Sequence, residues 1–297
     1  MIFPESLKKG DAIGVIAPAG PFDKDEYFKG KQLLDDKGYK IVEAPNIFNN
    51  DSYLYSDEQK KIEDIEFVFK NKEIKGVFAI RGGYGAGRLL PYINKKIIID
   101  NPKLFIGSSD LTAFHLLFNK FVGMSTIYGP MITGNYSFSK EENTLKSLLN
   151  VLEIPKKIEY NIKDNIIINE RDFSGEFFAG CLSLMVSFLG TKYDLSYDNK
   201  ILFLEDVNEP LYKVDRMLNQ LNLAGKFDNI KGLFITVSNL KDLEIKELFH
   251  YHFNKFKFPT VINFSSGHTL PNYSLPIGYF AEVSIENRAF ILWKKKN

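Results

Sequence analysis

A predicted strand-to-helix turn lies in the stretch Leu104-Phe105-Ile106-Gly107-Ser108-Ser109-Asp110-Leu111. The first residues form a short apolar run, which predicts a buried strand, and the residues after Gly107 lead into a segment of helical period. A serine on such a turn presents its hydroxyl above the sheet edge, beside the backbone N–H groups at a helix N-terminus. The pattern indicates nucleophilic acyl chemistry, although it also fits an ordinary loop in which Asp110 caps the helix.

Apolar runs on both sides of this turn alternate with stretches of helical period up to about residue 135. Ser56 and Gln59 have capping-box spacing at the start of a helix that we expect to end near Asn71. Strands alternating with helices predict a parallel, doubly wound sheet, with ligand chemistry at the carboxyl ends of its strands. The expected strands are Ala12–Ala17, Lys40–Val42, Gly76–Ile80, Lys103–Ile106 and Met124–Tyr128.

A second series of strands and helices follows a polar stretch that runs from Ser137 to about Asn169. We predict an α/β protein with an N-terminal doubly wound parallel-sheet domain over residues 1–136, a linker or crossover over 137–169 and a smaller C-terminal α/β domain over 170–297. The expected strands are Ile201–Leu204, Gly232–Val237, Thr260–Phe264 and Ala281–Ile285, and the expected helices are Leu182–Leu189, Tyr212–Leu221 and Leu243–Phe253.

Composition narrows the class of protein. With 297 residues, 44% apolar and 25% charged, the chain is long enough to bury large cores. The formal charge of +1 gives no general electrostatic case for nucleic acid or an anionic membrane, and no apolar run approaches a membrane span. The single Cys181 excludes an internal disulfide framework, and one Cys with four His shows no zinc spacing. We therefore expect a cytoplasmic protein that needs no metal or cofactor.

A glycine-rich loop, Arg81-Gly82-Gly83-Tyr84-Gly85-Ala86-Gly87-Arg88, directly follows one of the expected strands. Glycines permit positive φ and let backbone N–H groups approach an anion closely. The spacing departs from G-x-G-x-x-G and no Walker lysine is present, so an oxyanion or carboxylate loop is favoured over a nucleotide loop. The alternative is a tight turn without a ligand.

An acidic pair, Glu205-Asp206, ends the expected strand Ile201–Leu204. A carboxylate at this position can orient an imidazole and stabilise its cation, as the third member of a catalytic triad does. Either residue fits this role. The alternative is a helix cap or a surface charge.

Four histidines are candidates for a general base. His268 lies in a loop bounded by Gly267 and Pro271, which suits delivery of a side chain to a cleft. His115 and His252 share helix faces with apolar residues and are expected to be packed, and nothing distinguishes His250 from a surface residue. The chain order Ser109, Glu205, His268 matches the order of nucleophile, acid and histidine in one class of hydrolase triad.

Six linked blocks extend this pattern along the chain. They are Gly76–Arg88, Ile106–Asp110 before Leu111-Thr112, Tyr128-Gly129-Pro130-Met131, Gly180-Cys181-Leu182-Ser183-Leu184, Leu202–Pro210 with Tyr212, Asp215 and Arg216, and Gly267-His268 before Leu275-Pro276-Ile277-Gly278. Taken in order, from about Lys9 to Gly278, they resemble the LD-carboxypeptidase family of serine peptidases. That family includes muramoyltetrapeptide carboxypeptidases and the related microcin C immunity peptidases.

The resemblance implies roles for individual residues. Ser109 would be the nucleophile, Glu205 and His268 would complete the triad, and the amides of Gly83 and Asp110 would form the oxyanion hole. This chain has Ser108 where the family usually has an aromatic residue.

Family likeness also implies a substrate, namely murein tetrapeptides that lose a terminal D-amino acid, typically D-Ala, in the cytoplasm, and it implies a homodimer. A free terminal carboxylate needs a cation, for which the candidates are Arg81, Arg88 and Arg216. One alternative is a microcin-immunity-like peptidase or amidase that cleaves peptidyl-nucleotide conjugates. Another is a non-catalytic protein that binds a carboxylate.

Overall fold

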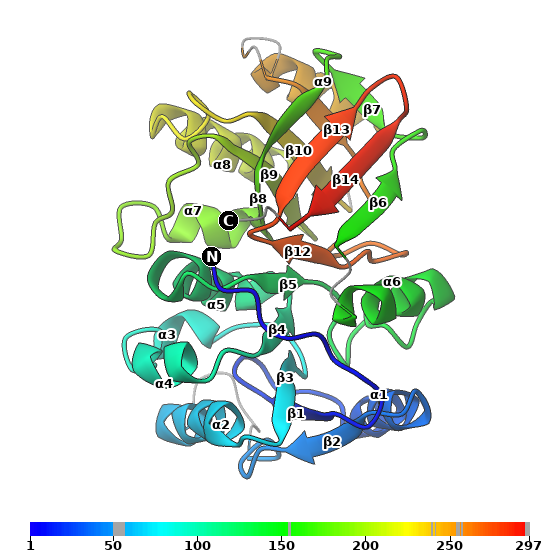
Figure 1. Cartoon of the computed structure of the whole chain (residues 1–297). Helices are drawn as coiled ribbons and strands as arrows, with labels where there is room; N and C mark the ends of the chain where they lie inside the picture. The colour runs from blue at the N-terminus through cyan, green and yellow to red at the C-terminus, as the bar shows by residue number, and fades with distance from the viewer. Residues whose placement is uncertain are drawn as a thin grey trace.

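The computed structural model describes residues 1–49, 57–153, 156–238, 240, 242–253, 256 and 258–294. Two sheets, one below the other in Figure 1, form the cores of two lobes. Ser56, and with it the expected capping box, lies outside the described residues. Helix α2 (Glu58–Lys70) begins instead after Asp57, whose carboxylate accepts hydrogen bonds from the backbone N–H groups of Gln59 and Lys60.

The lower sheet has the strand order β12-β5-β4-β3-β1-β2. The first five strands along the chain pair in parallel, as the alternating pattern predicted, and β12 runs antiparallel to β5. The strands are β1 (Ala12–Ile16), β2 (Lys40–Glu43), β3 (Ile74–Ala79), β4 (Leu104–Gly107), β5 (Thr126–Tyr128) and β12 (Leu275–Ile277).

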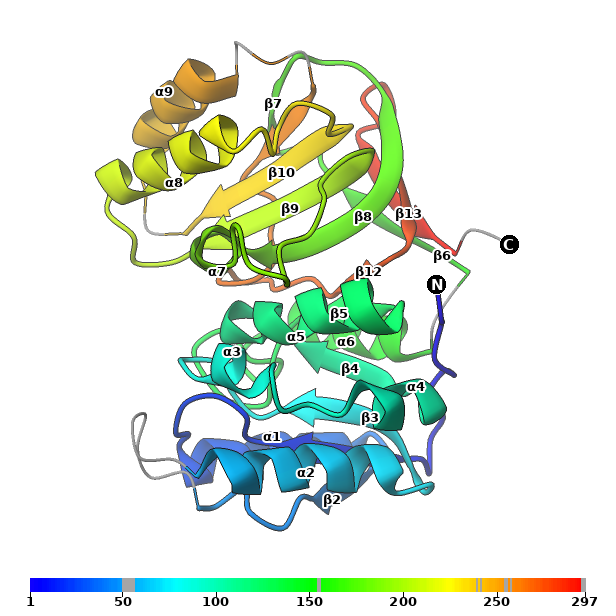
Figure 2. The ribbon, with the colours of Figure 1, turned by 90° about the vertical axis from the view of Figure 1, so that its left-hand side faces the viewer.

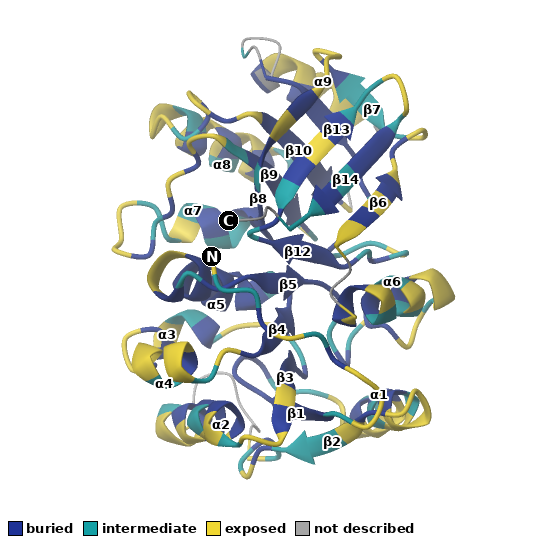
Figure 3. Ribbon diagram, viewed as in Figure 1, coloured by how far each residue is buried: buried dark blue, intermediate teal, exposed yellow. Residues whose placement is uncertain are grey.

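Helices cover both faces of the lower sheet, so the sheet is doubly wound. Figure 1 shows α2, α3, α4 and α5 on the left of the sheet and α1 and α6 on the right. The inner strands β1, β4 and β5 are covered on both faces and all of their residues are buried, and Figure 3 shows β4 and β5 in the colour of buried residues. The edge strand β2 is only half-buried. The bounds are α1 (Lys24–Asp36), α3 (Ala86–Leu89), α4 (Lys95–Asp100), α5 (Thr112–Leu117) and α6 (Glu142–Leu152).

The upper sheet is mixed, with the strand order β6-β14-β13-β8-β9-β10-β11-β7. Its four strands from β8 to β11 are parallel, and the others pair antiparallel. The strands are β6 (Lys157–Asn161), β7 (Ile166–Ile168), β8 (Phe173–Cys181), β9 (Lys200–Asp206), β10 (Gly232–Val237), β11 (Thr260–Ile262), β13 (Phe280–Ser284) and β14 (Ala289–Trp293). Helices α7 (Leu182–Ser187), α8 (Leu211–Leu223) and α9 (Asp242–Phe253) lie beside the parallel part.

The stretch 137–169, expected as a linker or crossover, contains α6 and the edge strands β6 and β7. Its polar composition has a local cause. Along β6, Ile158 and Tyr160 are buried while the residues between and beside them are exposed. Such alternation is typical of an edge strand with one wet face.

The two lobes meet directly, and β12 connects them. β12 follows the upper-sheet strand β11 in the chain but completes the edge of the lower sheet. Close by, the Thr112 hydroxyl of α5 accepts a hydrogen bond from the Cys181 N–H at the end of β8, at 2.9 Å. In Figure 2 the arrowheads of β4 and β10 point to the same side, so the carboxyl ends of both parallel sets open on one face of the molecule. No helix within the described ranges is long and apolar enough to cross a membrane.

Candidate active site

A cavity of about 260 Å³ opens where the carboxyl ends of the strands of the two sheets meet. Its walls come from the loops that follow β3, β4 and β5 below and β9 and β11 above. Ser109, His268, Arg81 and Gly83 are among the lining residues. The structure thus brings residues far apart in the sequence to the edge at which a parallel α/β sheet binds its ligands.

Ser109 sits on a strained turn directly after β4. Its φ is 59°, a left-handed conformation that few residues other than glycine adopt, and Ser108 before it is extended. The Ser109 N–H donates a hydrogen bond to the Tyr128 hydroxyl at 3.1 Å. A Cβ on Gly82 would lie 3.1 Å from the Ser109 Cβ, so the glycine loop passes close against the serine. The turn places the Ser109 side chain at the cavity wall.

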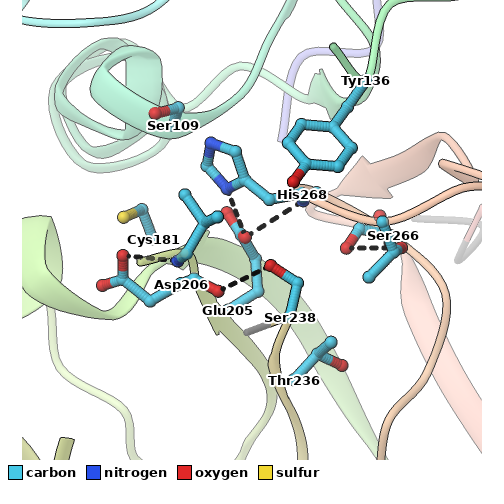
Figure 4. Close-up of polar contacts among 12 residues, drawn as sticks. Ser109, Tyr136, Cys181, Glu205, Asp206, Thr236, Ser238, Ser266 and His268 are labelled. Carbon is cyan, nitrogen blue, oxygen red and sulfur yellow. Dashed lines mark hydrogen bonds and ion pairs between the residues drawn. The ribbon is translucent and has the colours of Figure 1, made fainter. Parts of the chain in front are cut away.

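Glu205 and His268 form the polar centre of the upper wall (Figure 4). Glu205 is 1% exposed, and its Oε2 accepts from the His268 Nδ1–H at 2.7 Å and from the His268 backbone N–H at 3.2 Å. Because the carboxylate only accepts, Nδ1 carries the proton and Nε2 remains available as a base. Gly267 permits this contact, since a Cβ there would lie 2.4 Å from the Glu205 Cδ.

The electrostatics of His268 contain two opposing effects. Burial of the ring favours the neutral form and lowers its pKa. The charge and hydrogen bond of Glu205, with a contribution from Asp206, favour the imidazolium and outweigh burial, so the pKa of His268 is raised above its ordinary value. The surroundings therefore stabilise the cation that a general base becomes when it accepts a proton.

Asp206, the alternative acid, has a different environment. Its carboxylate accepts hydrogen bonds from the backbone N–H groups of Ser183 at 2.8 Å and Val207 at 2.9 Å. The first of these bonds satisfies an N–H group in the first turn of α7. Burial, followed by the neighbouring charge of Glu205, raises the pKa of Asp206. Of the two carboxylates, the structure brings Glu205 into contact with the His268 ring.

His115 and His252 pack away from the cavity, as their helix positions predicted. His115 is fully buried, with Nε2 2.9 Å from the Gly107 carbonyl oxygen and Nδ1 2.8 Å from the Thr126 hydroxyl. Burial lowers the pKa of His115 to about 4, which keeps the ring neutral, and Nε2 must carry its proton because a carbonyl only accepts. His252 Nε2 on α9 lies 2.6 Å from Asp215 Oδ1 on α8.

The glycine loop is tied to the serine turn through Asp110. Asp110 Oδ2 accepts the Ala86 N–H at 2.7 Å, and burial raises the pKa of this carboxyl to about 6. Beneath the loop, the buried Lys61 ammonium donates to the Ala19 carbonyl at 2.8 Å, and burial lowers its pKa to about 8. Among the hydrogen bonds of the described residues, none is donated by the N–H of Gly83 or Asp110.

The three candidate arginines lie in different places. Arg81 lines the cavity and donates to the Pro21 carbonyl at 2.6 Å. Arg88 pairs with Glu58 at 2.5 Å, and the Arg216 guanidinium lies 5.4 Å from the centre of the Tyr212 ring. Neither Arg88 nor Arg216 is among the residues that line the cavity. Within the described ranges, no group of three or more His, Cys, Asp or Glu side chains is arranged to hold a metal ion.

Three residues at the site were given no role by sequence reasoning, although two of them lie within the six blocks. Tyr128 bonds both Ser109 and Glu205, Lys61 lies under the glycine loop, and Asn208 lines the cavity with a φ of 58°. Tyr128 carried a usable signal, because it ends a buried strand next to the strand of the serine turn. Lys61 precedes Ile65 and Val68 by four and seven residues, so its spacing on α2 placed it on the buried face, but nothing in the pattern indicated a partner for its ammonium group.

This two-sheet fold, with a strand-end serine and a carboxylate-bound histidine at one cavity, is that of a serine-type hydrolase. Comparison with known proteins narrows the class. Residues 13–129 match the family profile described as the LD-carboxypeptidase N-terminal domain, and residues 174–283 match that of the LD-carboxypeptidase C-terminal domain. The chain belongs to the LD-carboxypeptidase family, whose members are serine-type carboxypeptidases.

Individual relatives span nearly the whole chain. A probable murein peptide carboxypeptidase from Bacillus subtilis is 29% identical over 97% of this chain and 93% of its own length. The microcin self-immunity protein MccF from Escherichia coli is 24% identical over 95% and 93%. Among solved structures, an MccF-like protein from Bacillus anthracis superposes with a TM-score of 0.90 at 25% identity, covering 99% of this chain and 100% of its own. A muramoyltetrapeptide carboxypeptidase from Oxalobacter formigenes gives 0.81 at 26%, covering 96% and 99%.

Proposed function

We propose that this protein is a serine L,D-carboxypeptidase that releases the C-terminal D-Ala from murein tetrapeptides. The observation that carries the proposal is the single cavity lined by Ser109, His268 and Arg81, with Glu205 buried behind the histidine. This set offers a nucleophile, a base with its orienting acid, and a cation for a free carboxylate. The murein peptide carboxypeptidase among the relatives supports the substrate class.

In the proposed reaction, Ser109 Oγ attacks the carbonyl carbon of the last peptide bond while His268 Nε2 takes its proton. Glu205 stabilises the imidazolium through Nδ1. The N–H groups of Gly83 and Asp110, which donate to no other described group, stabilise the oxyanion. The imidazolium then protonates the departing amine, and water, deprotonated by His268, hydrolyses the acyl-enzyme. The imidazolium formed in that step returns its proton to Ser109 Oγ as the acid product leaves.

Arg81 is the residue we assign to the substrate carboxylate. Its guanidinium lies at the cavity wall, where one nitrogen is fixed by the Pro21 carbonyl. A guanidinium fixed in this way can bind a carboxylate through its remaining N–H groups, and the bound carboxylate then sets the direction of the terminal side chain.

The test is a panel of three peptides that differ only at the end. The tetrapeptide L-Ala-D-Glu-diamino acid-D-Ala should release D-Ala, the same peptide ending in L-Ala should react about 10²-fold more slowly, and the C-terminal amide should fail. Arg81→Gln should raise KM for the acid. Equal hydrolysis of the acid and the amide contradicts carboxylate anchoring.

The second candidate function is cleavage of a peptidyl-nucleotide or acyl-sulfamoyl conjugate. Similarity to MccF over 95% of the chain favours its inclusion. Incubation of the protein with an aminoacyl-sulfamoyl adenosine in the same assay decides between the two. Faster release of the amino acid from that compound than of D-Ala from the tetrapeptide would favour this alternative.

We also propose a cytoplasmic homodimer that acts in murein recycling, in line with the family resemblance and the buried, unpaired Cys181. Cell fractionation and light scattering on the purified protein test location and oligomeric state separately. Recovery of the protein outside the cytoplasm, or a monomer at cellular concentration, contradicts the corresponding part.

A further inference from the structure

One hydroxyl group lies between the two halves of the proposed triad. Tyr128 ends β5 and is fully buried. Its oxygen accepts the Ser109 N–H at 3.1 Å, and its proton is donated to Glu205 Oε1. The path from the serine turn in the lower sheet to the carboxylate in the upper sheet is thus two hydrogen bonds long.

The direction of each hydrogen bond is fixed by chemistry. A carboxylate only accepts, so the Tyr128 hydroxyl must be the donor toward Glu205. A backbone N–H only donates, so Ser109 uses a lone pair of the same oxygen. Glu205 Oε2 receives His268, and Oε1 receives Tyr128. Both oxygens of the proposed triad acid are therefore occupied, and the plane of the carboxylate is set by two partners from opposite sheets.

The Tyr128 ring has a separate packing role. It contacts His115 at 5.6 Å and Phe203 at 6.2 Å between ring centres. A phenylalanine ring would keep both contacts. Substitution of Tyr128 by Phe therefore isolates the hydroxyl from the packing of the ring.

We propose that Tyr128 is a positioning residue whose hydroxyl holds the Glu205 carboxylate and the Ser109 turn in register, so that His268 faces the nucleophile. This inference rests on the proposed serine mechanism. Removal of the hydroxyl frees one oxygen of the buried Glu205 and leaves the partly buried Ser109 N–H without its acceptor.

The titratable groups that face Tyr128 come from several elements. Glu205 belongs to β9, Cys181 ends β8, and His115 lies on α5. Burial, followed by the charge of Glu205, raises the pKa of Tyr128 well above its ordinary value. The hydroxyl therefore keeps its proton at any pH at which the enzyme works, and it remains a donor.

The main test is Tyr128→Phe, with Tyr160→Phe as the matched control. Tyr160 is also buried, and its hydroxyl donates to a carbonyl, that of Ser274, outside the cavity. Both variants should lower Tm by similar amounts. Only Tyr128→Phe should lower kcat, by about 10-fold to 100-fold with KM little changed, because small misplacements of catalytic groups are costly. A wild-type kcat in Tyr128→Phe overturns the inference.

A second readout does not depend on turnover. In the resting protein, the His268 ring can be titrated by NMR, with its signal assigned by comparison with His268→Ala. Tyr128→Phe should raise the pKa of His268, because Glu205 loses a donor that partly neutralises its charge. If the wild-type protein cleaves no peptide, the proposed function fails while this titration still tests the inference. An unchanged titration contradicts it.

A third variant covers the case in which Tyr128→Phe does not fold. Glu205→Gln changes the hydrogen-bond partner of the Tyr128 hydroxyl in the upper lobe. It should therefore change the NMR chemical shift of the Ser109 backbone amide in the lower lobe. Asp206→Asn is the matched control, since Asp206 bonds Ser183 and Val207 instead. If the Ser109 resonance stays in place in Glu205→Gln, or moves equally in both variants, the hydroxyl does not couple the two sheets.

Discussion

The two walls of the cavity are built in different ways. The lower wall uses the main chain: Ser109 has a φ of 59°, Gly83 a φ of 111°, and the N–H groups of Gly83 and Asp110 donate to no other group of the described residues. The upper wall uses side-chain charge, with Glu205 and His268 held together at 2.7 Å. The proposed nucleophile, placed by backbone conformation, and the proposed base, placed by a buried carboxylate, should therefore respond differently to substitution.

The difference has an energetic side. The glycines and backbone amides that line the lower wall carry no net charge, and the buried charges of Asp110 and Lys61 are not among the lining residues and are each paired with a backbone group. The upper wall buries a carboxylate, which is costly unless its charge and both oxygens find partners. Glu205 finds them in His268 and Tyr128. Substitutions in the lower wall should therefore lower activity by distorting the backbone, and substitutions in the upper wall by removing a partner of a buried charge.

The largest effect should come from the serine pair. Ser109→Ala should lower kcat on the order of 10³-fold or more, because the nucleophilic oxygen is lost. Ser108→Ala, at the extended position beside it, should retain much of the activity. Steady-state kinetics on the D-Ala tetrapeptide measure both. The opposite ranking would move the nucleophile to Ser108.

Removal of the charged pair should be nearly as damaging. His268→Ala and Glu205→Ala should each lower kcat on the order of 10³-fold, and each should add little to Ser109→Ala because the three residues act as a unit. His115→Ala is the control: it should cost stability, about 3 kcal/mol in urea unfolding, with kcat of the folded fraction retained. A comparable kcat loss in His115→Ala would contradict the assignment of the base.

Two glycines with positive φ allow the effect of backbone strain to be separated from the effect of a new side-chain contact. Gly267 and Gly123 have φ values of 75° and 66°, so an alanine at either carries the same backbone strain, about 1 to 2 kcal/mol. Only at Gly267 does the new Cβ meet a neighbour, 2.4 Å from the Glu205 Cδ. Gly267→Ala should therefore lower kcat about 10²-fold, whereas Gly123→Ala should leave it unchanged. Equal kcat values would mean that the Glu205 contact does not matter.

The smallest effect concerns pH. The base must be neutral, and the pKa of His268 is raised, so wild-type kcat/KM should fall on the acid side of a midpoint above His268's ordinary value of 6.5. In Glu205→Gln the carboxylate charge is gone and burial dominates, so the midpoint of the residual activity should move to lower pH. Measurement of kcat/KM between pH 4 and 9 for both proteins shows in which direction the midpoint moves. A midpoint that moves to higher pH refutes the account.

The sequence predicted the fold class correctly, because both parallel sets are short apolar runs separated by helices of clear period. The expected strand Gly232–Val237 coincides with β10. Edge strands such as β6 were missed because one of their faces is exposed to solvent, which makes their composition polar. The contact of Glu205 with His268 agrees with the predicted triad order, while the catalytic roles stay predictions.

Other features were out of reach for physical reasons. The bond from Tyr128 to Glu205 joins residues 77 positions apart, so no local pattern reports it. The pairing of β12 with β5 is equally remote and depends on how the lobes dock. The hydrogen bond from the Lys61 ammonium to the Ala19 carbonyl joins residues 42 positions apart, which a helix pattern does not contain.

The placement of β12 has a consequence for how the protein is made. While the chain leaves the ribosome from its N-terminus, the lower sheet can form β1 to β5, but the outer edge of β5 stays unpaired until Leu275–Ile277 has emerged. An open strand edge invites pairing with other chains. The loop that bears His268 lies between β11 and β12, so the segment that closes the edge also fixes the position of the proposed base. Protection of this strand edge and placement of the proposed base thus arise in the same late step of synthesis.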